Sequence, residues 1–457
     1  MRDQKNTCES GSIREMASLT LPLVVSLSCD TLMIFTNRLL LSKISPDAMN
    51  ASMGGGIAAY QCLSFFVGLV GYTTALVAQQ YGAGQRRNAS RAAFQAMLIA
   101  LAVWPILACL GPFAREIFNH MGLVPEQARL QSEYFSVVIL GSGFYLLRST
   151  LSGFFCGIGR TGVVMLSAIA ALVVNACVAW VLIFGRMGFQ AAGVRGAAIG
   201  VLIGTLAGVG VLVAAYFKKE NRKMYNVLDS FHYDKGLMKS LVGFGYPAGL
   251  ELMLNVLAFN TLVTLLHGCG PATATAATIL FNWDLISILP LVGIEIGVTS
   301  LVGRYMGARD YSAAHQSVRS GLKLVLVFAI VLAPFFVGIP ELLVGIFQPQ
   351  ETNKVFTQAA YLAESMLRFA ALYVFSNGIL LLYAGALRGA GDTLYTMAFN
   401  VGMHWIMAGG MYVALKYMHA TPIQGWLLVV LLFTFSPIIL WLRWNRGQLT
   451  KREKIAC

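Results

Sequence analysis

The sequence predicts an all-α polytopic membrane protein with twelve transmembrane helices in two six-helix lobes. Hydrophobic residues make up 57% of the 457-residue chain, charged residues only 12%, and the mean hydropathy is +0.69. Such a composition is typical of a chain that lies mostly in lipid. Lipid offers no hydrogen-bond partner to backbone amides, so every spanning segment must be helical.

Twelve apolar stretches reach the length of about 20 residues that a spanning helix needs. Met1 to Ser18 is polar and the first apolar run can itself span, so we expect no cleaved signal peptide. The longest connection, 218–240, is too short for a soluble domain. The predicted spans are 17–42, 52–79, 91–111, 134–156, 162–185, 194–217, 241–267, 276–304, 316–338, 358–386, 394–417 and 423–443.

The positive charge of the chain indicates its orientation. The formal net charge is +13, and most of the 33 Lys and Arg residues fall in the termini and the even-numbered connections. This asymmetry predicts a multi-pass protein of the cytoplasmic (inner) membrane with both termini cytoplasmic. Its basic runs lack interleaved aromatic residues, so we expect membrane lipids as partners, and no nucleic acid. We expect the chain to function as a monomer.

Catalytic and cofactor motifs are missing. The eight cysteines show no paired spacing, which predicts neither a disulfide nor a metal site. The segment GIGRTG, residues 157–162, satisfies G-x-G-x-x-G, but it joins two apolar helices with no strand before it, so we reject dinucleotide binding. We expect no cofactor, no catalytic residues and no enzyme activity.

An internal repeat organises the chain. Pro22 and Pro247 both open apolar runs and lie 225 residues apart, as do Gly82 and Gly307. Each half therefore has the same six-helix plan in the same orientation, as parallel repeats of transporters do. The predicted parts are an N-terminal lobe 1–217, a basic cytoplasmic linker 218–240, a C-terminal lobe 241–443 and a cytoplasmic tail 444–457.

Several motifs resemble those of the multidrug and toxic compound extrusion (MATE) transporters. They are PLVV in the first apolar run, ALVAQQYGAG and SLVGRYMGAR at equivalent places in the two halves, VLIFG, GVRGAAIG and GALRGAGDT. The resemblance covers about residues 15–440. It implies secondary-active efflux of small organic, often cationic, compounds by alternating access, driven by inward Na⁺ or H⁺ as the transported coupling ion.

The chain departs from the family at the acidic positions that the resemblance implies. Asn37 stands where MATE proteins usually have Asp, and Asn255 where they often have Glu. Asn377 replaces an Asp of one branch, while Asn175 is kept and Ala179 stands where Asp is common. An amide oxygen can coordinate a cation, but the amide cannot carry a proton or a charge.

Four acids interrupt the predicted spans instead: Asp30, Glu251, Asp284 and Glu295. A carboxylate in a bilayer is costly, so each is a functional candidate, with a bond to a neighbouring helix as the plainer interpretation. Asp30 shares a helix face with Asn37, Glu251 with Asn255, and Asp284 with Glu295. The predicted ion-coupling residues are therefore Asp30, Asn37, Asn175, Glu251, Asn255, Asp284, Glu295 and Asn377.

Two interpretations of the departures remain open. In the first, coupling has moved along the same helices to Asp30 and Glu251. In the second, the chain is coupled differently or weakly, and Asp30 packs or recognises substrate. Arg38 is expected to extend to the membrane interface. If it turned inward instead, its charge could act on Asp30, two turns away on the same helix.

Aromatic, Met and polar residues within the spans are candidate lining of a substrate cavity, because such surfaces suit flat cations and varied apolar compounds. Ordinary helix packing is the plainer interpretation of each. The candidates are Tyr60, Gln61, Asn282, Trp283, Tyr383, Met397, His404 and Trp405.

The favoured function is thus ion-coupled export of small amphipathic or cationic compounds. A flippase for lipid-linked precursors or oligosaccharides is the nearest alternative, and it would be expected to have more helices and a cationic cavity. An ion channel would need a pore repeat or a ring of like residues. A membrane enzyme ranks last.

Overall fold

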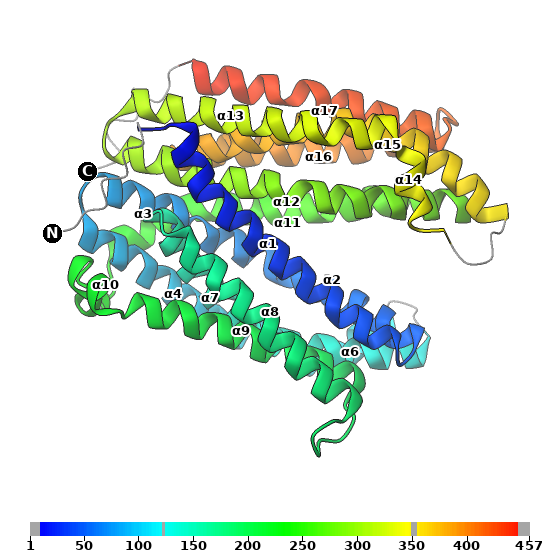
Figure 1. The fold of residues 1–457 in the computed structure, drawn as a ribbon, viewed down its shortest axis with the longest axis horizontal. Helices are drawn as coiled ribbons and strands as arrows, with labels where there is room; N and C mark the ends of the chain where they lie inside the picture. The colour runs from blue at the N-terminus through cyan, green and yellow to red at the C-terminus, as the bar shows by residue number, and fades with distance from the viewer. Residues whose placement is uncertain (1–9, 121–123, 349–353, 447–457) are drawn as a thin grey trace. The chain divides into compact units, whose positions relative to one another are not determined.

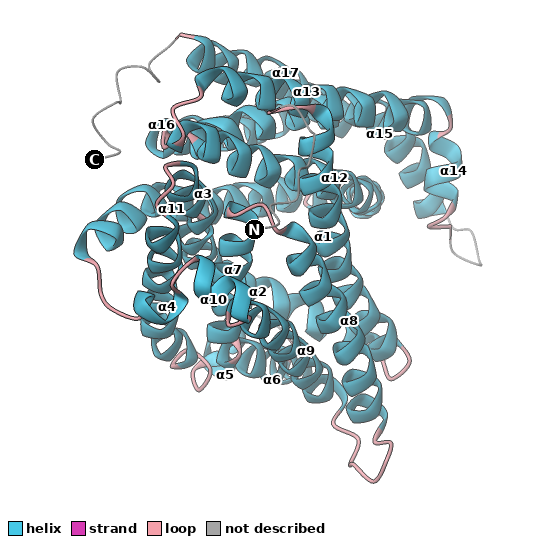
Figure 2. Cartoon of the chain, turned by 60° about the vertical axis from the view of Figure 1, so that its left-hand side comes forward, coloured by secondary structure: helices cyan, strands magenta, loops and turns pink. Residues whose placement is uncertain are grey.

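A computed structural model describes residues 10–120, 124–348 and 354–446, and the regular structure in these ranges is entirely helical (Figures 1 and 2). This confirms the predicted all-α class. The long helices are α1 Ile13–Ser42, α2 Pro46–Gly71, α4 Arg86–Ala108, α6 Pro125–Leu140, α7 Ser142–Gly157, α8 Thr161–Phe184, α9 Gly193–Tyr216, α11 Lys235–His267, α12 Pro271–Gly307, α13 Tyr311–Ala333, α15 Lys354–Gly389, α16 Thr393–Lys416 and α17 Pro422–Asn445. The short ones are α3 Thr73–Gly82, α5 Ala114–His120, α10 Lys219–Met224, η1 Val227–Ser230, η2 Pro334–Gly338 and α14 Pro340–Gly345.

The predicted spans correspond to helices of the structure, and two of them, 134–156 and 394–417, differ from a straight, strongly apolar helix. Among the described residues, ten helices are long and apolar enough to cross a membrane, or eleven if the bent pair α6 and α7 counts as one. The predicted span 394–417 coincides with α16, which is long enough but less apolar, because Asn400, His404 and Lys416 interrupt its hydrophobic residues. The predicted span 134–156 is not one straight helix but part of the bent pair.

The bend between α6 and α7 measures 47° and has a local cause. Gly141 ends α6, and the indole nitrogen of Trp104 in α4 donates a hydrogen bond of 2.7 Å to the carbonyl of Leu140. A Cβ on Gly143 would lie only 2.3 Å from the Trp104 ring, so only glycine admits the indole there. A side chain inserted at a helix break is a common origin of a kink. The bend sets the direction of α7 relative to α6.

Glycines bring α9 unusually close to α8. Gly196, Gly200, Gly204 and Gly208 recur every fourth residue, so they form one stripe along α9. A Cβ on each would come within about 3 Å of the facing helix or its side chains, and at Gly200 it would be 2.8 Å from the Cβ of Ala179. Small residues that let backbones approach are typical of packing between membrane helices.

The chain divides into two compact units, of which one combines two separate segments and the other is continuous. One comprises Met1–Thr20 and Leu254–Cys457, and the other Leu21–Met253. The predicted lobes follow the sequence repeat, whereas these units follow packing, so their second boundary falls inside α11 and not in 218–240.

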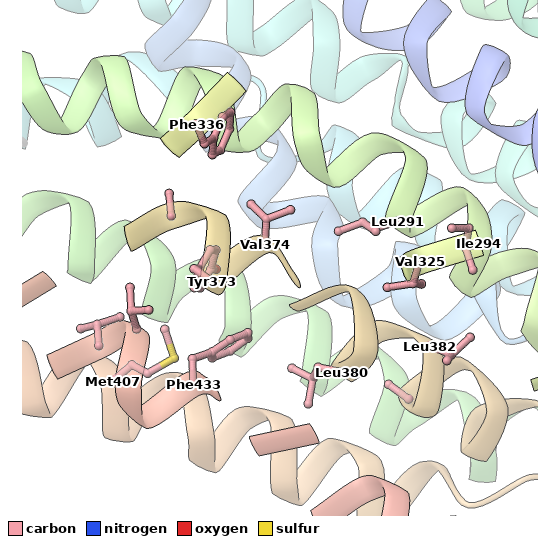
Figure 3. Close-up of a cluster of buried hydrophobic side chains, with 14 of the residues drawn as sticks. Leu291, Ile294, Val325, Phe336, Tyr373, Val374, Leu380, Leu382, Met407 and Phe433 are labelled. Atoms are coloured by element: carbon pink, nitrogen blue, oxygen red, sulfur yellow. The ribbon is translucent and has the colours of Figure 1, made fainter. Parts of the chain in front are cut away.

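The unit that contains Leu254–Cys457 has the larger hydrophobic core. Leu291 of α12, Val374 of α15 and Phe433 of α17 belong to it, and Figure 3 shows these side chains among their neighbours. Met16 and Leu19 of α1 belong to the same cluster. The first turns of α1 are therefore packed as part of this core.

A polar network holds the start of α1 within the same unit. The Tyr305 hydroxyl donates a 2.6 Å hydrogen bond to the Glu15 carboxylate, and the backbone N–H of Gly11 donates to the same oxygen at 2.9 Å. Arg304 pairs with the other oxygen at 3.3 Å. The Ser320 hydroxyl donates to the Gly11 carbonyl. One carboxylate thus accepts from three donors, two on α12 and one in the backbone just before α1.

Candidate functional site: ion pairs within the membrane helices

An ion pair joins α1 to α7 in the unit Leu21–Met253. Arg148 Nη1 lies 2.8 Å from Asp30 Oδ1. The arginine side chain is 8% exposed and that of the aspartate 38%, so the pair is buried on its cationic side and open on its acidic side. Arg148 Nε is buried and has no hydrogen-bond partner in the described part of the chain. The guanidinium therefore has donor capacity that Asp30 does not use.

Two other helices shape the space around Arg148. A Cβ on Gly208 of α9 would lie 3.2 Å from Arg148 Nε and 3.1 Å from the carbonyl oxygen of Ser167. The Ser167 hydroxyl of α8 donates to the Gly208 carbonyl at 2.8 Å. The last glycine of the stripe along which α8 and α9 approach each other therefore lies next to the guanidinium of Arg148.

Tyrosines flank the pair. Tyr145 precedes Arg148 by three residues on α7, hence on the same helix face, and lies within electrostatic range of Tyr60, Asp30 and Arg148. Tyr60 is 39% and Tyr145 37% exposed, close to the value for the Asp30 side chain. Of the predicted cavity residues, Tyr60 is the one that falls in this cluster.

The predicted residues Asn37 and Asn175 meet each other. Asn37 Nδ2 donates to Asn175 Oδ1 at 3.3 Å, and Asn175 Nδ2 donates to Asn37 Oδ1 at 3.1 Å. The two residues are 1% and 0% exposed. The amides therefore satisfy each other and tie α1 to α8, two turns of α1 beyond Asp30.

A second buried ion pair lies in the other unit. Glu295 of α12 accepts a hydrogen bond from Arg388 of α15, with side chains 10% and 23% exposed. Gly385 admits the acid, since a Cβ there would lie 2.7 Å from the Glu295 carbonyl oxygen, and the Thr299 hydroxyl donates to the Gly385 carbonyl. This geometry ties α12 to α15 and leaves Glu295 little exposed surface.

Asp284 lies on the same helix as Glu295. One of its carboxylate oxygens is buried without a hydrogen-bond partner among the described residues. It lies within electrostatic range of Tyr373 on α15. Both acids of α12 therefore interact with residues of α15.

The remaining predicted coupling residues are buried or half-buried. Glu251 of α11 is 5% exposed, and Asn377 of α15 is 6% exposed. Asn255 is half-buried one turn after Glu251, and its Oδ1 has no hydrogen-bond partner within the described ranges. The predicted cavity residue Gln61 donates to the Met253 carbonyl at 3.4 Å, which ties α2 to α11.

Most of the other predicted cavity residues take part in helix packing. Trp283 Nε1 donates to the Leu343 carbonyl at 3.2 Å, and Tyr383 is 6% exposed in the core. His404 Nδ1 lies 2.8 Å from the Asn400 carbonyl, and its ring meets Phe433 edge to face. Asn282 donates to the Thr278 carbonyl of its own helix. Met397 is half-buried and Trp405 is 40% exposed.

Sequence reasoning missed Arg148. The cation beside Asp30 comes from α7 and not from Arg38, whose side chain is half-buried near Tyr134. A signal was present, because Arg148 interrupts the apolar run 134–156 just as Asp30 interrupts 17–42. The rule that marks an intramembrane acid as functional applies equally to a base.

Comparison with known proteins places this fold in a family. The family model described as MatE matches residues 22–181 and 247–408, one segment in each repeat and more than half of the chain together. The chain is 25% identical over 396 residues to a probable multidrug resistance protein NorM of Thermotoga maritima, covering 84% of this chain and 82% of the relative. It is also 25% identical over 398 residues to the multidrug resistance protein PmpM of Pseudomonas aeruginosa, covering 86% and 82%.

Solved structures agree on the fold. A MOP superfamily transporter from Pyrococcus furiosus superimposes with a TM-score of 0.87 at 17% identity and 97% coverage of both chains. An outward-facing MATE family transporter gives a TM-score of 0.86 at 18% identity, with 96% of this chain and 97% of that one covered. The resemblance inferred from the motifs is thereby confirmed, and the chain belongs to the MatE family of membrane transporters, which are not enzymes.

Proposed function

We propose that the chain is a multidrug exporter, a secondary-active antiporter that moves small amphipathic compounds outward in exchange for inward protons by alternating access. Its family membership supports transport, and the relatives compared above are named multidrug resistance proteins. The observation that carries the coupling is the Asp30–Arg148 pair. Asp30 lies on α1, the helix in which Asn37 stands where the resemblance implies an acid.

Protons suit this site better than Na⁺. A Na⁺ ion needs several oxygen ligands and would lie close to a guanidinium, which repels it. A proton needs only one carboxylate oxygen of Asp30, whose side chain is 38% exposed. Protonation changes the charge of the pair from neutral to +1, and a charge change of this kind can bias a two-state transporter.

The setting of the transporter is part of the same proposal. The charge asymmetry of the connections supports cytoplasmic termini in an inner membrane. One chain carries both repeats, which supports a monomer as the working unit.

Reconstituted vesicles test the coupling. We expect an imposed pH gradient to drive dye movement and a Na⁺ gradient to fail. The double variant Asp30→Asn/Arg148→Gln, which leaves no lone buried charge, should lose the response to pH. Asp229→Asn, a change at a carboxylate that is 60% exposed, is the matched control and should keep it. Transport driven by Na⁺ in the unaltered protein, or by pH in the double variant, contradicts the proposal.

Drug export itself is tested separately in cells. A host without its own pumps that expresses the chain should tolerate higher concentrations of some members of a dye and antibiotic panel. Unchanged susceptibility to every compound, with the protein present in the membrane, contradicts export.

A further inference from the structure

The linker 218–240 is an ordered part of the unit Leu21–Met253, in which α10 and η1 pack against α9 and the first turns of α4 (Figure 1). The Ser90 hydroxyl of α4 donates a 2.7 Å hydrogen bond to the Tyr225 carbonyl. The side chain of Gln95, also of α4, donates to the His232 carbonyl at 3.0 Å and accepts from the Asp234 N–H at 3.2 Å. Hydrogen bonds at three places therefore hold the linker in one orientation.

One face of the linker is buried. The Tyr225 ring is 2% exposed and meets the Phe154 ring edge to face at 5.5 Å. The Asn221 side chain accepts a 2.6 Å hydrogen bond from Arg160 and donates to the Ala215 carbonyl at 2.7 Å. Asn221 and Tyr225 are four residues apart, hence on one side of α10, and the opposite side of this helix faces away from the unit.

The outward side of α10 is basic. Lys219 and Lys223 lie one turn apart on the side opposite to Asn221, Arg222 lies beside them, and all three cations are exposed. Within the described residues these three form no ion pair, whereas each acid of the linker has a basic partner within 4.0 Å. Those acids are Glu220, paired with Lys218, Asp229, paired with Arg87, and Asp234, paired with Arg91. The linker therefore presents positive charge that the protein does not neutralise.

Exposed apolar side chains accompany these cations. Phe217, directly before the linker, is 41% exposed, and Phe231 is 44% exposed. Their rings stack with centroids 5.9 Å apart and an interplanar angle of 3°. Met224 and Leu228 are exposed as well. Aromatic and apolar side chains next to Lys and Arg are typical of segments that lie at the headgroup level of a membrane.

We infer that α10 and the stacked rings of Phe217 and Phe231 form a binding surface for anionic phospholipids. Lys219, Arg222 and Lys223 bind the phosphate oxygens. The two rings contact the region where headgroups meet acyl chains. The choice of the cytoplasmic leaflet rests on the setting proposed above, whereas the surface itself belongs to one unit and stands without it.

The position of the surface favours a lipid over a soluble partner. The linker directly connects two helices that are apolar enough to span a membrane, α9, which ends at Tyr216, and α11, which begins at Lys235. The hydrogen bond from Asn221 to the Ala215 carbonyl holds α10 against the end of α9. Attraction to anionic headgroups falls off within a Debye length of about 10 Å, so cations held at the end of a spanning helix lie within its reach.

Native mass spectrometry of the purified full chain tests the surface without depending on transport. The protein in detergent is titrated with phosphatidylglycerol or with phosphatidylcholine of the same acyl chains, and the bound lipids are counted. The unaltered protein should bind phosphatidylglycerol at least about tenfold more tightly, since each cation near anionic headgroups contributes roughly a fivefold factor. Lys219→Gln/Arg222→Gln/Lys223→Gln should lose most of this preference and keep its melting temperature, because all three side chains are exposed.

A matched control removes three cations elsewhere in the same unit. Arg115→Gln/Arg186→Gln/Arg195→Gln changes exposed residues of two other connections and should keep the preference for phosphatidylglycerol. Lys219→Arg/Lys223→Arg, which retains the charge, should keep it too. An unchanged preference in the triple linker variant, or an equal loss in the matched control, overturns the surface.

Further outcomes separate a lipid from other ligands. Glycerophosphoglycerol, the soluble headgroup of phosphatidylglycerol, should fail to compete at the concentrations at which the lipid binds, because it has no acyl chains to place beside the rings. Equal competition would assign the cations to free phosphates, and binding of oligoglutamate without a lipid preference would assign them to an acidic protein. Either result overturns the lipid surface.

The leaflet and the transport function are tested apart from the surface. In intact cells, a membrane-impermeant maleimide should label Lys223→Cys no more than the unaltered chain. Stronger labelling contradicts the cytoplasmic leaflet and leaves the lipid preference standing. Failure of export with the lipid preference intact contradicts the proposed function alone.

Discussion

Asn37 and Asn175 exchange two hydrogen bonds across the contact between α1 and α8, and both are almost fully buried. This is the place where the usual acid of the family would lie. Two amides can each donate to and accept from the other without carrying a charge. The position has therefore become a structural link, and the acid on the same helix lies two turns earlier at Asp30.

The first prediction concerns this link. Asn37→Ala should lower the free energy of unfolding by about 1–3 kcal/mol, because it leaves the buried Asn175 amide without its partner. Asn37→Ala/Asn175→Ala should cost less than the sum of the two single changes, which a double-mutant cycle of thermal unfolding in detergent measures. Proton-driven transport by the folded single variant should persist. Additive costs, or loss of coupling in that variant, would show that the amides act separately or take part in coupling.

The second prediction concerns the buried pair in α12 and α15. Glu295→Gln should destabilise the protein by about 3–5 kcal/mol, because it removes the carboxylate partner of the little-exposed Arg388. The matched control is Glu341→Gln, since Glu341 and Arg368 form a pair exposed by 58% and 48%. Its loss should cost about 0–1 kcal/mol. Equal shifts in melting temperature for the two variants would contradict the distinction.

The third prediction concerns the start of α1. Tyr305→Phe removes the 2.6 Å hydrogen bond to Glu15 and the 3.1 Å hydrogen bond that the Gly11 N–H donates to the Tyr305 hydroxyl, while it keeps the ring in place. Hydrogen–deuterium exchange over residues 13–19 should become faster, because the start of α1 and the residues before it then lose two hydrogen bonds to α12. Tyr311→Phe, at the start of α13, is a control that should leave exchange in α1 unchanged. Unaltered exchange in Tyr305→Phe would mean that the hydrophobic contacts of Met16 and Leu19 hold this segment without the network.

The helices could be read from the sequence because each spanning segment must satisfy its own backbone in lipid. The side-chain contacts between different helices could not be read from the sequence. Asn37 and Asn175 are separated by 138 positions, and their contact depends on how α1 and α8 are rotated. Asp30 was identifiable as an acid in an apolar run, but its partner depends on the bend at Gly141, where Trp104 inserts and redirects α7. Local patterns fix which segments are helical, whereas side-chain contacts between distant helices depend on packing.

The last prediction uses two glycines of α9 that differ only in surroundings. A Cβ on Gly208 would lie 3.2 Å from Arg148 Nε and 3.1 Å from the Ser167 carbonyl oxygen, whereas nothing lies within 4 Å of a Cβ on Gly210. Gly210→Ala should therefore stabilise the protein by about 0.5–1 kcal/mol through its helix propensity. Gly208→Ala should lose that gain and displace the guanidinium from Asp30, so its melting temperature should be lower and its transport driven by a pH gradient weaker than those of Gly210→Ala. Since both variants add one methyl group to the same helix, equal stability and equal transport would show that Gly208 does not position Arg148.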